Sequence, residues 1–253
     1  MTRAKGLKKP GRRGFLTLGL AILSLPLTGK AASAVPAGGS TSRPAAKPVV
    51  QRARLPRRLA ADFHKHIDTR LPHLRPHFET AAQETGFSWR VLAALGYQES
   101  RWRPAAVSPR GAQGVMMLMP VTAKKMGVGD VFAPDENILG GARYLAYMKG
   151  RIPKRIRDPD RTWMALAAYN IGIGHLEDAR IITQMRKKNP DRWPDVRANL
   201  PRLSDPHWHA RVKRGYANGS ETVQFVERVS QFAAILESRV PDSSLAQSKP
   251  ATP

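Results

Sequence analysis

A chain of 253 residues with 42% hydrophobic residues is long enough to bury the core of one sizeable domain and to carry extensions beside it. Cysteine is absent, which excludes disulfide bonds and an acylated cysteine as a lipid anchor. The formal net charge of +23 favours polyanionic partners, and charge alone leaves nucleic acid, cell-wall polymers and anionic membrane surfaces open.

Residues 1–34 are typical of a secretory signal peptide. A basic segment that ends at Arg12-Arg13 precedes an apolar run from Phe15 to Leu27, and Ala32-Ser33-Ala34 matches an A-x-A cleavage site. The paired arginines also resemble a twin-arginine export signal. Because the apolar run is short for a membrane span, we expect cleavage rather than a retained anchor. Export to the periplasm or cell envelope favours cell-wall polymers or an anionic envelope surface as partners, and no nucleic acid is expected.

The chain after the signal segment divides by composition and periodicity. Residues 35–58 are rich in Ala, Pro, Ser and Arg without any acid, which is typical of a flexible basic linker. Residues 59–240 show helical periodicity almost throughout and no convincing strand alternation, and residues 241–253 are expected to form a disordered tail. The sequence therefore predicts an all-α domain, with helices at Arg58–Thr69, His73–Thr85, Ser88–Ser100, a short segment after Pro120, Asn137–Lys149, Pro159–Tyr169, Gly174–Lys187, Asp191–Asn199 and Glu221–Glu237.

The helix predicted for Ser88–Ser100 carries Glu99 in its last turn, before Pro104, which helps to end it. Glu99 shares a largely apolar face with Leu92 and Leu95. Burial and the negative end of the helix dipole both disfavour the charged carboxylate, so its pKa is expected to be raised. A glutamate with a raised pKa can act as a general acid near neutral pH. The alternative is a surface glutamate at a helix end.

The segment after Glu99 contains no other acid before Asp130. Ser108 to Gly111 reads as a turn, and Gly114 permits a close approach of the backbone to a ligand or to another element. The methionines that follow either form an adaptable apolar floor or pack in the core; they are Met116, Met117 and Met119.

Further candidates lie nearer the C-terminus. The Tyr169 hydroxyl, at the end of an apolar helix, can donate to a carboxylate or can be satisfied within the core. Asn170 with the glycines after it predicts a turn that tolerates a left-handed conformation. Tyr216, before a glycine turn, is a weaker candidate, and the helix-start position of Glu221 favours a helix-dipole role.

No metal site or other cofactor is expected. The paired histidines come without an HExxH motif or a cysteine partner; they are His64/His66, His73/His77 and His207/His209. Ser108 lacks the strand–turn–helix setting of an acyl-transfer nucleophile.

Three ordered motifs resemble the lytic transglycosylases with the SLT, or goose-lysozyme-like, fold. They are Glu99-Ser100 followed by Trp102, Pro104, Ala106, Ser108, Gly111-Ala112, Gly114-Val115-Met116 and Thr122-Ala123; then Ala168-Tyr169-Asn170 with Gly172 and Gly174; and then Tyr216-Ala217-Asn218-Gly219 with Glu221-Thr222 and Phe225-Val226. The resemblance spans roughly residues 75–236 and is greatest to the catalytic domains of the membrane-bound lytic murein transglycosylase F group. The sequence departs from the family at Met117, where many relatives carry glutamine, and at Phe225, where tyrosine is usual, which puts two sugar hydrogen bonds in question.

The resemblance implies a lysozyme-like helical domain with a substrate cleft. Such a domain would cleave the β-1,4 bond between N-acetylmuramic acid (MurNAc) and N-acetylglucosamine (GlcNAc) in peptidoglycan glycan strands, leaving 1,6-anhydroMurNAc ends. Glu99 would serve first as acid and then as base, whereas most glycoside hydrolases use two carboxylates. Tyr169 would hold Glu99, and the implied substrate-binding residues are Ser108, Gly114, Met117, Tyr169, Asn170 and Tyr216.

Two alternatives stay open at the level of sequence. One is a hydrolytic, lysozyme-type muramidase that uses water and a distant carboxylate such as Asp130 or Asp135. The other is a non-catalytic peptidoglycan-binding module.

Overall fold

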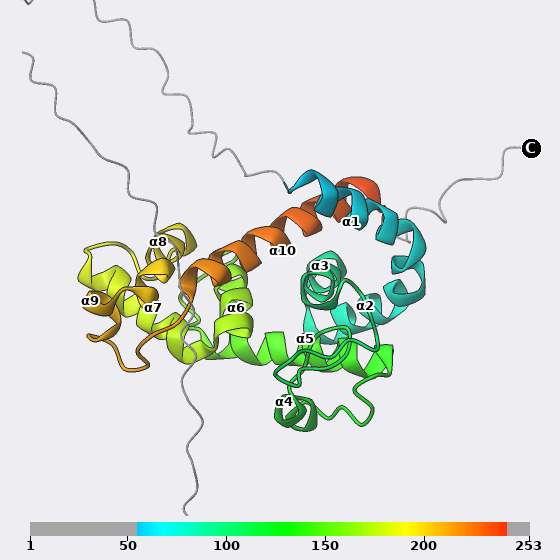
Figure 1. The fold of residues 1–253 in the computed structure, drawn as a ribbon, viewed down its shortest axis with the longest axis horizontal. Helices are drawn as coiled ribbons and strands as arrows, with labels where there is room; N and C mark the ends of the chain where they lie inside the picture. The colour runs from blue at the N-terminus through cyan, green and yellow to red at the C-terminus, as the bar shows by residue number, and fades with distance from the viewer. Residues whose placement is uncertain (1–54, 242–253) are drawn as a thin grey trace, which may run out of the picture. The chain divides into compact units, whose positions relative to one another are not determined.

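A computed structural model describes residues 55–241 of the chain (Figure 1). The predicted signal peptide, most of the predicted linker and residues 242–253 therefore fall outside the described residues. In chain order the helices are α1 (Arg57–Thr69), α2 (Leu71–Thr85), α3 (Trp89–Ser100), α4 (Pro120–Lys125), α5 (Pro134–Arg151), α6 (Asp160–Ile171), α7 (Ile173–Met185), α8 (Trp193–Asn199), the 3₁₀ helix η1 (Leu200–Ser204), α9 (Pro206–His209) and α10 (Gly219–Arg239).

The predicted all-α class is confirmed, because residues 55–241 contain only two isolated β-bridges, Val107–Gln113 and Gln113–Leu118, and no strand. Helix α1 begins at Arg57, inside the predicted linker. Helix α5 begins at Pro134, three residues before the prediction, since a proline suits the first turn of a helix. Helices η1 and α9 were not predicted. None of the described helices combines the length and apolarity that a membrane span requires.

Helix α3 packs against both α2 and α10, and its aromatic residues anchor it there. Phe63 of α1 lies with its ring centroid 4.4 Å from that of Tyr97 and 4.4 Å from that of Phe232, which belong to α3 and α10. Trp102 joins the same cluster, with its ring 4.7 Å from Tyr97. Such aromatic pairs stabilise a core by more than the burial of their apolar area alone would. The cluster therefore fixes the helix that carries Glu99.

Two left-handed residues end α3. Arg101 and Trp102 have φ of 56° and 57°, a conformation that costs roughly 1–2 kcal/mol for each residue other than glycine. The Arg101 N–H donates to the Tyr97 carbonyl at 2.8 Å, and the Trp102 indole N–H donates to the Ala93 carbonyl at 2.7 Å. These contacts offset the strain and turn the chain immediately after Glu99. The helix therefore ends before Pro104 has any effect.

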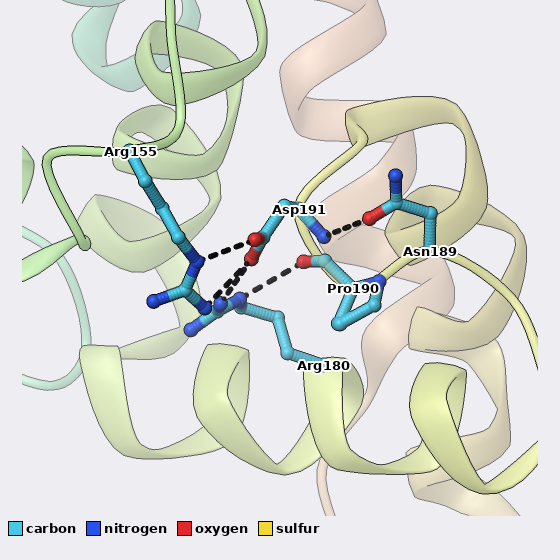
Figure 2. A network of polar contacts seen from close by, with 5 residues as sticks. All are labelled: Arg155, Arg180, Asn189, Pro190 and Asp191. Atoms are coloured by element: carbon cyan, nitrogen blue, oxygen red, sulfur yellow. Dashed lines mark hydrogen bonds and ion pairs between the residues drawn. The ribbon is translucent and has the colours of Figure 1, made fainter.

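A polar network fastens the turn after α7 (Figure 2). Asp191 accepts hydrogen bonds from Arg155 at 2.6 and 3.1 Å and from Arg180 at 2.6 Å. Arg180 also donates to the Pro190 carbonyl at 3.0 Å, and the Asn189 side chain accepts from the Asp191 N–H at 2.9 Å. The network thus joins α7 to the segment between α5 and α6 and to the turn that precedes α8.

Candidate active site

Glu99 lies at the wall of a cavity of about 320 Å³. Ser88 caps α3 as predicted, since its side chain accepts from the Arg90 N–H, and this places Glu99 in the last helical turn. Glu99 is half-buried. The cavity is lined by Glu99, Ser108, Arg110, Ala112, Met117, Leu118, Met119, Thr122, Tyr144, Tyr169 and Asn170.

Burial raises the pKa of Glu99 from 4.5 to about 8. At pH 7 a group with this pKa is about nine-tenths protonated. The predicted rise in pKa is therefore confirmed, and burial causes it. The arrangement holds a neutral carboxylic acid that can give up its proton near neutral pH.

The Tyr169 hydroxyl donates to the backbone carbonyl of Met116 at 2.7 Å, which corrects the expectation that it donates to Glu99. A hydroxyl has one proton, and the Met116 carbonyl would otherwise lose a partner in the core. Towards Glu99 the Tyr169 oxygen can only accept. Burial raises the pKa of Tyr169, and the nearby charge of Glu99 adds to the rise, so the two groups interact.

Asn137 of α5 holds the loop between α3 and α4, and sequence reasoning missed it. It is fully buried; its Oδ1 accepts from the Met116 N–H at 2.7 Å, and its Nδ2 donates to the carbonyls of Gln113 at 3.1 Å and Val131 at 2.9 Å. A lone polar residue beside the apolar run that begins at Ile138 is the signal that could have found it.

Gly114 packs against Asn137 and does not line the cavity. Its φ is +80°, and a Cβ there would lie 2.2 Å from the Asn137 side-chain nitrogen and 2.3 Å from the Val131 carbonyl oxygen. The close approach that the sequence predicts is therefore an approach to another element of the fold. Only glycine fits this position.

Ser108, Met117 and Asn170 all line the cavity beside Glu99. The predicted turn at Ser108 is confirmed: its carbonyl accepts from the Gly111 N–H at 2.9 Å and its hydroxyl oxygen accepts from the Ala112 N–H at 2.9 Å. Asn170 is helical, which corrects the predicted turn there, because α6 continues to Ile171 and the left-handed residue is Gly172, with φ of 88°.

Asn170 is also tied to the start of α10. Its Oδ1 accepts from the Thr222 hydroxyl at 2.8 Å, so the side chain is oriented from outside the cavity. Tyr216 is not brought to the cavity wall: it is 64% exposed, and its ring packs edge-on against His209 at 6.0 Å.

The cavity is also lined by residues that were not among the predicted site residues: Arg110, Tyr144 and Thr122, which the sequence offered only as part of a motif. The Tyr144 ring packs edge-on against Tyr169 with their centroids 5.1 Å apart. No second carboxylate lines the cavity within the described part of the chain. Asp130 instead accepts from the Phe132 N–H at 2.8 Å, and Asp135 lies in the first turn of α5.

Residues 55–241 contain no group of three or more His, Cys, Asp and Glu side chains that could hold a metal ion. The residues that line the cavity offer proton transfer by Glu99 together with hydrogen bonding from Ser108, Asn170 and Arg110.

Comparison with known proteins identifies the domain that forms this cavity. Residues 76–191 match the family model described as Transglycosylase SLT domain. The membrane-bound lytic murein transglycosylase F of Marinobacter nauticus is 49% identical over 177 residues, which cover 70% of this chain and 35% of that protein. Its namesake from Pseudomonas fluorescens is 48% identical over 177 residues, covering 70% and 36%. The chain thus spans about a third of the length of the curated relatives it matches.

A solved structure supports the fold assignment. The lytic transglycosylase Slt of Pseudomonas aeruginosa, crystallised as an inactive mutant, superimposes with a TM-score of 0.50 at 25% identity, covering 69% of this chain and 25% of that one. This agrees with the expected SLT, lysozyme-like helical fold. Residues 76–191, which match the transglycosylase SLT domain family, include every residue that lines the cavity around Glu99.

Proposed function

We propose that this chain is a peptidoglycan lytic transglycosylase, which cleaves the β-1,4 bond between MurNAc and GlcNAc and leaves a 1,6-anhydroMurNAc end. The observation that carries the proposal is a single protonated carboxyl group, Glu99, in a cavity whose described lining has no second carboxylate. The names of the relatives support the reaction class.

The proposed reaction uses Glu99 twice. The neutral acid gives its proton to the glycosidic oxygen as the bond from that oxygen to C1 of MurNAc breaks. The N-acetyl group of MurNAc stabilises the positive charge that develops at C1. The Glu99 carboxylate then takes the proton of the C6 hydroxyl, whose oxygen forms the new bond to C1. Glu99 ends the cycle protonated, and no water is consumed.

The neighbours of Glu99 have distinct proposed roles. Because the Tyr169 hydroxyl gives its own proton to the Met116 carbonyl, we assign its oxygen the role of accepting a hydrogen bond from the protonated Glu99 carboxyl and so orienting the acid. Ser108 and Asn170 hydrogen-bond the sugar substituents, and Met117 forms part of the apolar floor. Gly114 acts through the packing of the loop on Asn137 rather than by touching substrate.

Tyr216 lies outside the cavity, so a substrate role for it requires a strand that extends beyond the bond being cleaved.

The test is mass spectrometry of the fragments that the purified chain releases from peptidoglycan. Anhydro ends that disappear in Glu99→Gln support the proposal. Glu177→Gln is the matched control, because Glu177 is an exposed glutamate of α7 and does not line the cavity. Reducing ends would mean a hydrolytic muramidase, and binding without any release would mean a wall-binding module.

We further propose that the chain acts in the periplasm or cell envelope. The support is the signal peptide predicted for residues 1–34 and the basic linker predicted for residues 35–58, of which only residues 55–58 belong to the described part. Cell fractionation tests the location, and recovery of the protein from the cytoplasm alone would contradict it; N-terminal sequencing of the exported protein tests the cleavage. A start at Val35 supports cleavage, whereas an intact residue 1–34 segment on the exported protein contradicts it.

A further inference from the structure

A second cavity, of about 410 Å³, lies where α1 meets the turn that ends α3. None of its lining residues lines the cavity around Glu99. We refer to it as the guanidinium pocket, and its lining residues are Asp62, His66, Arg70, Arg101 and Arg103.

Hydrogen bonds fix the basic side chains of the guanidinium pocket. Arg70 donates to the Arg101 carbonyl at 2.7 Å, and Arg103 donates through Nε to the Ser100 carbonyl at 3.0 Å. His66 is hydrogen-bonded to the Tyr97 hydroxyl at 3.0 Å. These bonds run to α3 or to the left-handed turn after it, so the pocket is built on the end of the helix that carries Glu99.

The guanidinium pocket contains more positive than negative charge. Its one carboxylate, Asp62, pairs with Arg101 at 3.2 Å. Arg70 and Arg103 donate to neutral carbonyls, and neither forms an ion pair with any residue between 55 and 241. Burial, followed by the Arg70 charge, lowers the pKa of His66, so His66 is neutral at pH 7. With three guanidinium groups and one carboxylate, the guanidinium pocket has an excess of positive charge. Its volume is sufficient for one small anion.

Guanidinium groups bind carboxylates and phosphates through paired charge-assisted hydrogen bonds. The substrate in the proposed function supplies a carboxylate, because a neutral glycan strand bears peptide stems that end in carboxyl groups. Arg101 and Arg103 lie between Glu99 and Ser108 in the chain, so the pocket and the cavity share one segment. A stem of four residues reaches about 13 Å when extended. The proposal requires a stem of this reach to leave the cavity and pass around the end of α3.

We propose that the guanidinium pocket binds a carboxylate of the peptide stem, so that the chain distinguishes stem-bearing from stem-free glycan strands. The inference rests on the proposed function, since it takes peptidoglycan as the substrate.

The experiment compares kcat/KM of the full-length chain on peptidoglycan strands with and without peptide stems, the latter prepared with an amidase. The variants are Arg70→Gln together with Arg103→Gln, Arg103→Gln alone, and Arg157→Gln. Arg157 is an exposed arginine outside both cavities, and its substitution removes one positive charge, as Arg103→Gln alone does. We expect the wild type to prefer stem-bearing strands. The double variant should reduce that preference about tenfold, the order expected when charge-assisted hydrogen bonds are lost. Arg157→Gln should keep the wild-type preference.

The outcomes separate the two proposals. Wild-type protein that cleaves neither substrate overturns the proposed function. Wild-type protein that cleaves both substrates equally well, or a double variant with an unchanged preference, overturns the inference alone. If circular dichroism shows that the double variant does not fold, Arg103→Gln decides, because Arg103 is exposed and its backbone N–H still donates to the Ser100 hydroxyl.

Titration with inorganic phosphate and with a soluble stem peptide distinguishes the two sources of an anion. Peptide binding that weakens in the double variant supports the inference. Phosphate binding without any peptide binding overturns it in favour of a phosphate site.

Discussion

Replacing Glu99 by glutamine should change how the stability of the protein depends on pH, even without substrate. The folded protein holds the Glu99 proton with a pKa of about 8, against an ordinary value of 4.5. Because the folded-state pKa is raised, the stabilisation is fully present below pH 4.5. It is lost as the pH rises from about 4.5 through 8. Glutamine stays neutral, so Glu99→Gln escapes this loss.

The size of the effect follows from the two pKa values. Relative to strongly acidic solution, the wild type loses about 1 kcal/mol of unfolding free energy at pH 5 and about 3 kcal/mol at pH 7 through Glu99. The advantage of Glu99→Gln over the wild type should therefore grow by about 2–2.5 kcal/mol between pH 5 and pH 7 and level off near pH 9. Contact of the half-buried side chain with water makes this an upper limit.

Urea unfolding at pH 5, 6, 7 and 8 measures this difference, because groups common to both proteins cancel. Glu177→Gln is the control and should track the wild type at every pH, since Glu177 is exposed. A difference between Glu99→Gln and the wild type that does not vary with pH would refute the raised pKa, and with it the acid role. Cleavage activity should fall as the pH rises through about 8, because the acid is then lost.

Three further substitutions test the supports of the site. Tyr169→Phe leaves the Met116 carbonyl without its partner and should cost about 1–3 kcal/mol in urea unfolding while lowering turnover; wild-type values for both would contradict this role. Asn137→Ala removes three hydrogen bonds and leaves the Met116 N–H and the Val131 carbonyl without a partner, so it should cost about 3 kcal/mol or more in urea unfolding; a loss below about 1 kcal/mol would contradict this role. Asp191→Asn should lower stability by only about 1 kcal/mol, and less in high salt, because the network is partly exposed; a melting temperature equally lowered at all salt concentrations would argue against an ionic contribution.

Local signals predicted the position of Glu99 well. The Ser88 cap and the apolar spacing of one helix lie within a dozen residues of Glu99. The local sequence is therefore sufficient to predict that Glu99 lies in the last turn of this helix. The turn at Ser108 was predictable for the same reason, because its hydrogen bonds join residues at most four apart.

Long-range contacts account for what the sequence did not reveal. The direction of the Tyr169 hydrogen bond depends on the Met116 carbonyl, 53 residues away in the chain. The neighbour of Gly114 is Asn137, which only the packing of α5 brings there. Arg70 and Arg101, 31 residues apart, likewise meet only through the fold.

The single amide of Asn137 has a consequence for motion. Its three hydrogen bonds join α5 to Gln113 and Met116 of the loop between α3 and α4, and to Val131 of the segment between α4 and α5. The floor and α5 therefore form one mechanical unit, and the loop cannot open like an independent flap. In hydrogen exchange, the Met116 amide should exchange as slowly as the core of α5, because both require the same large opening.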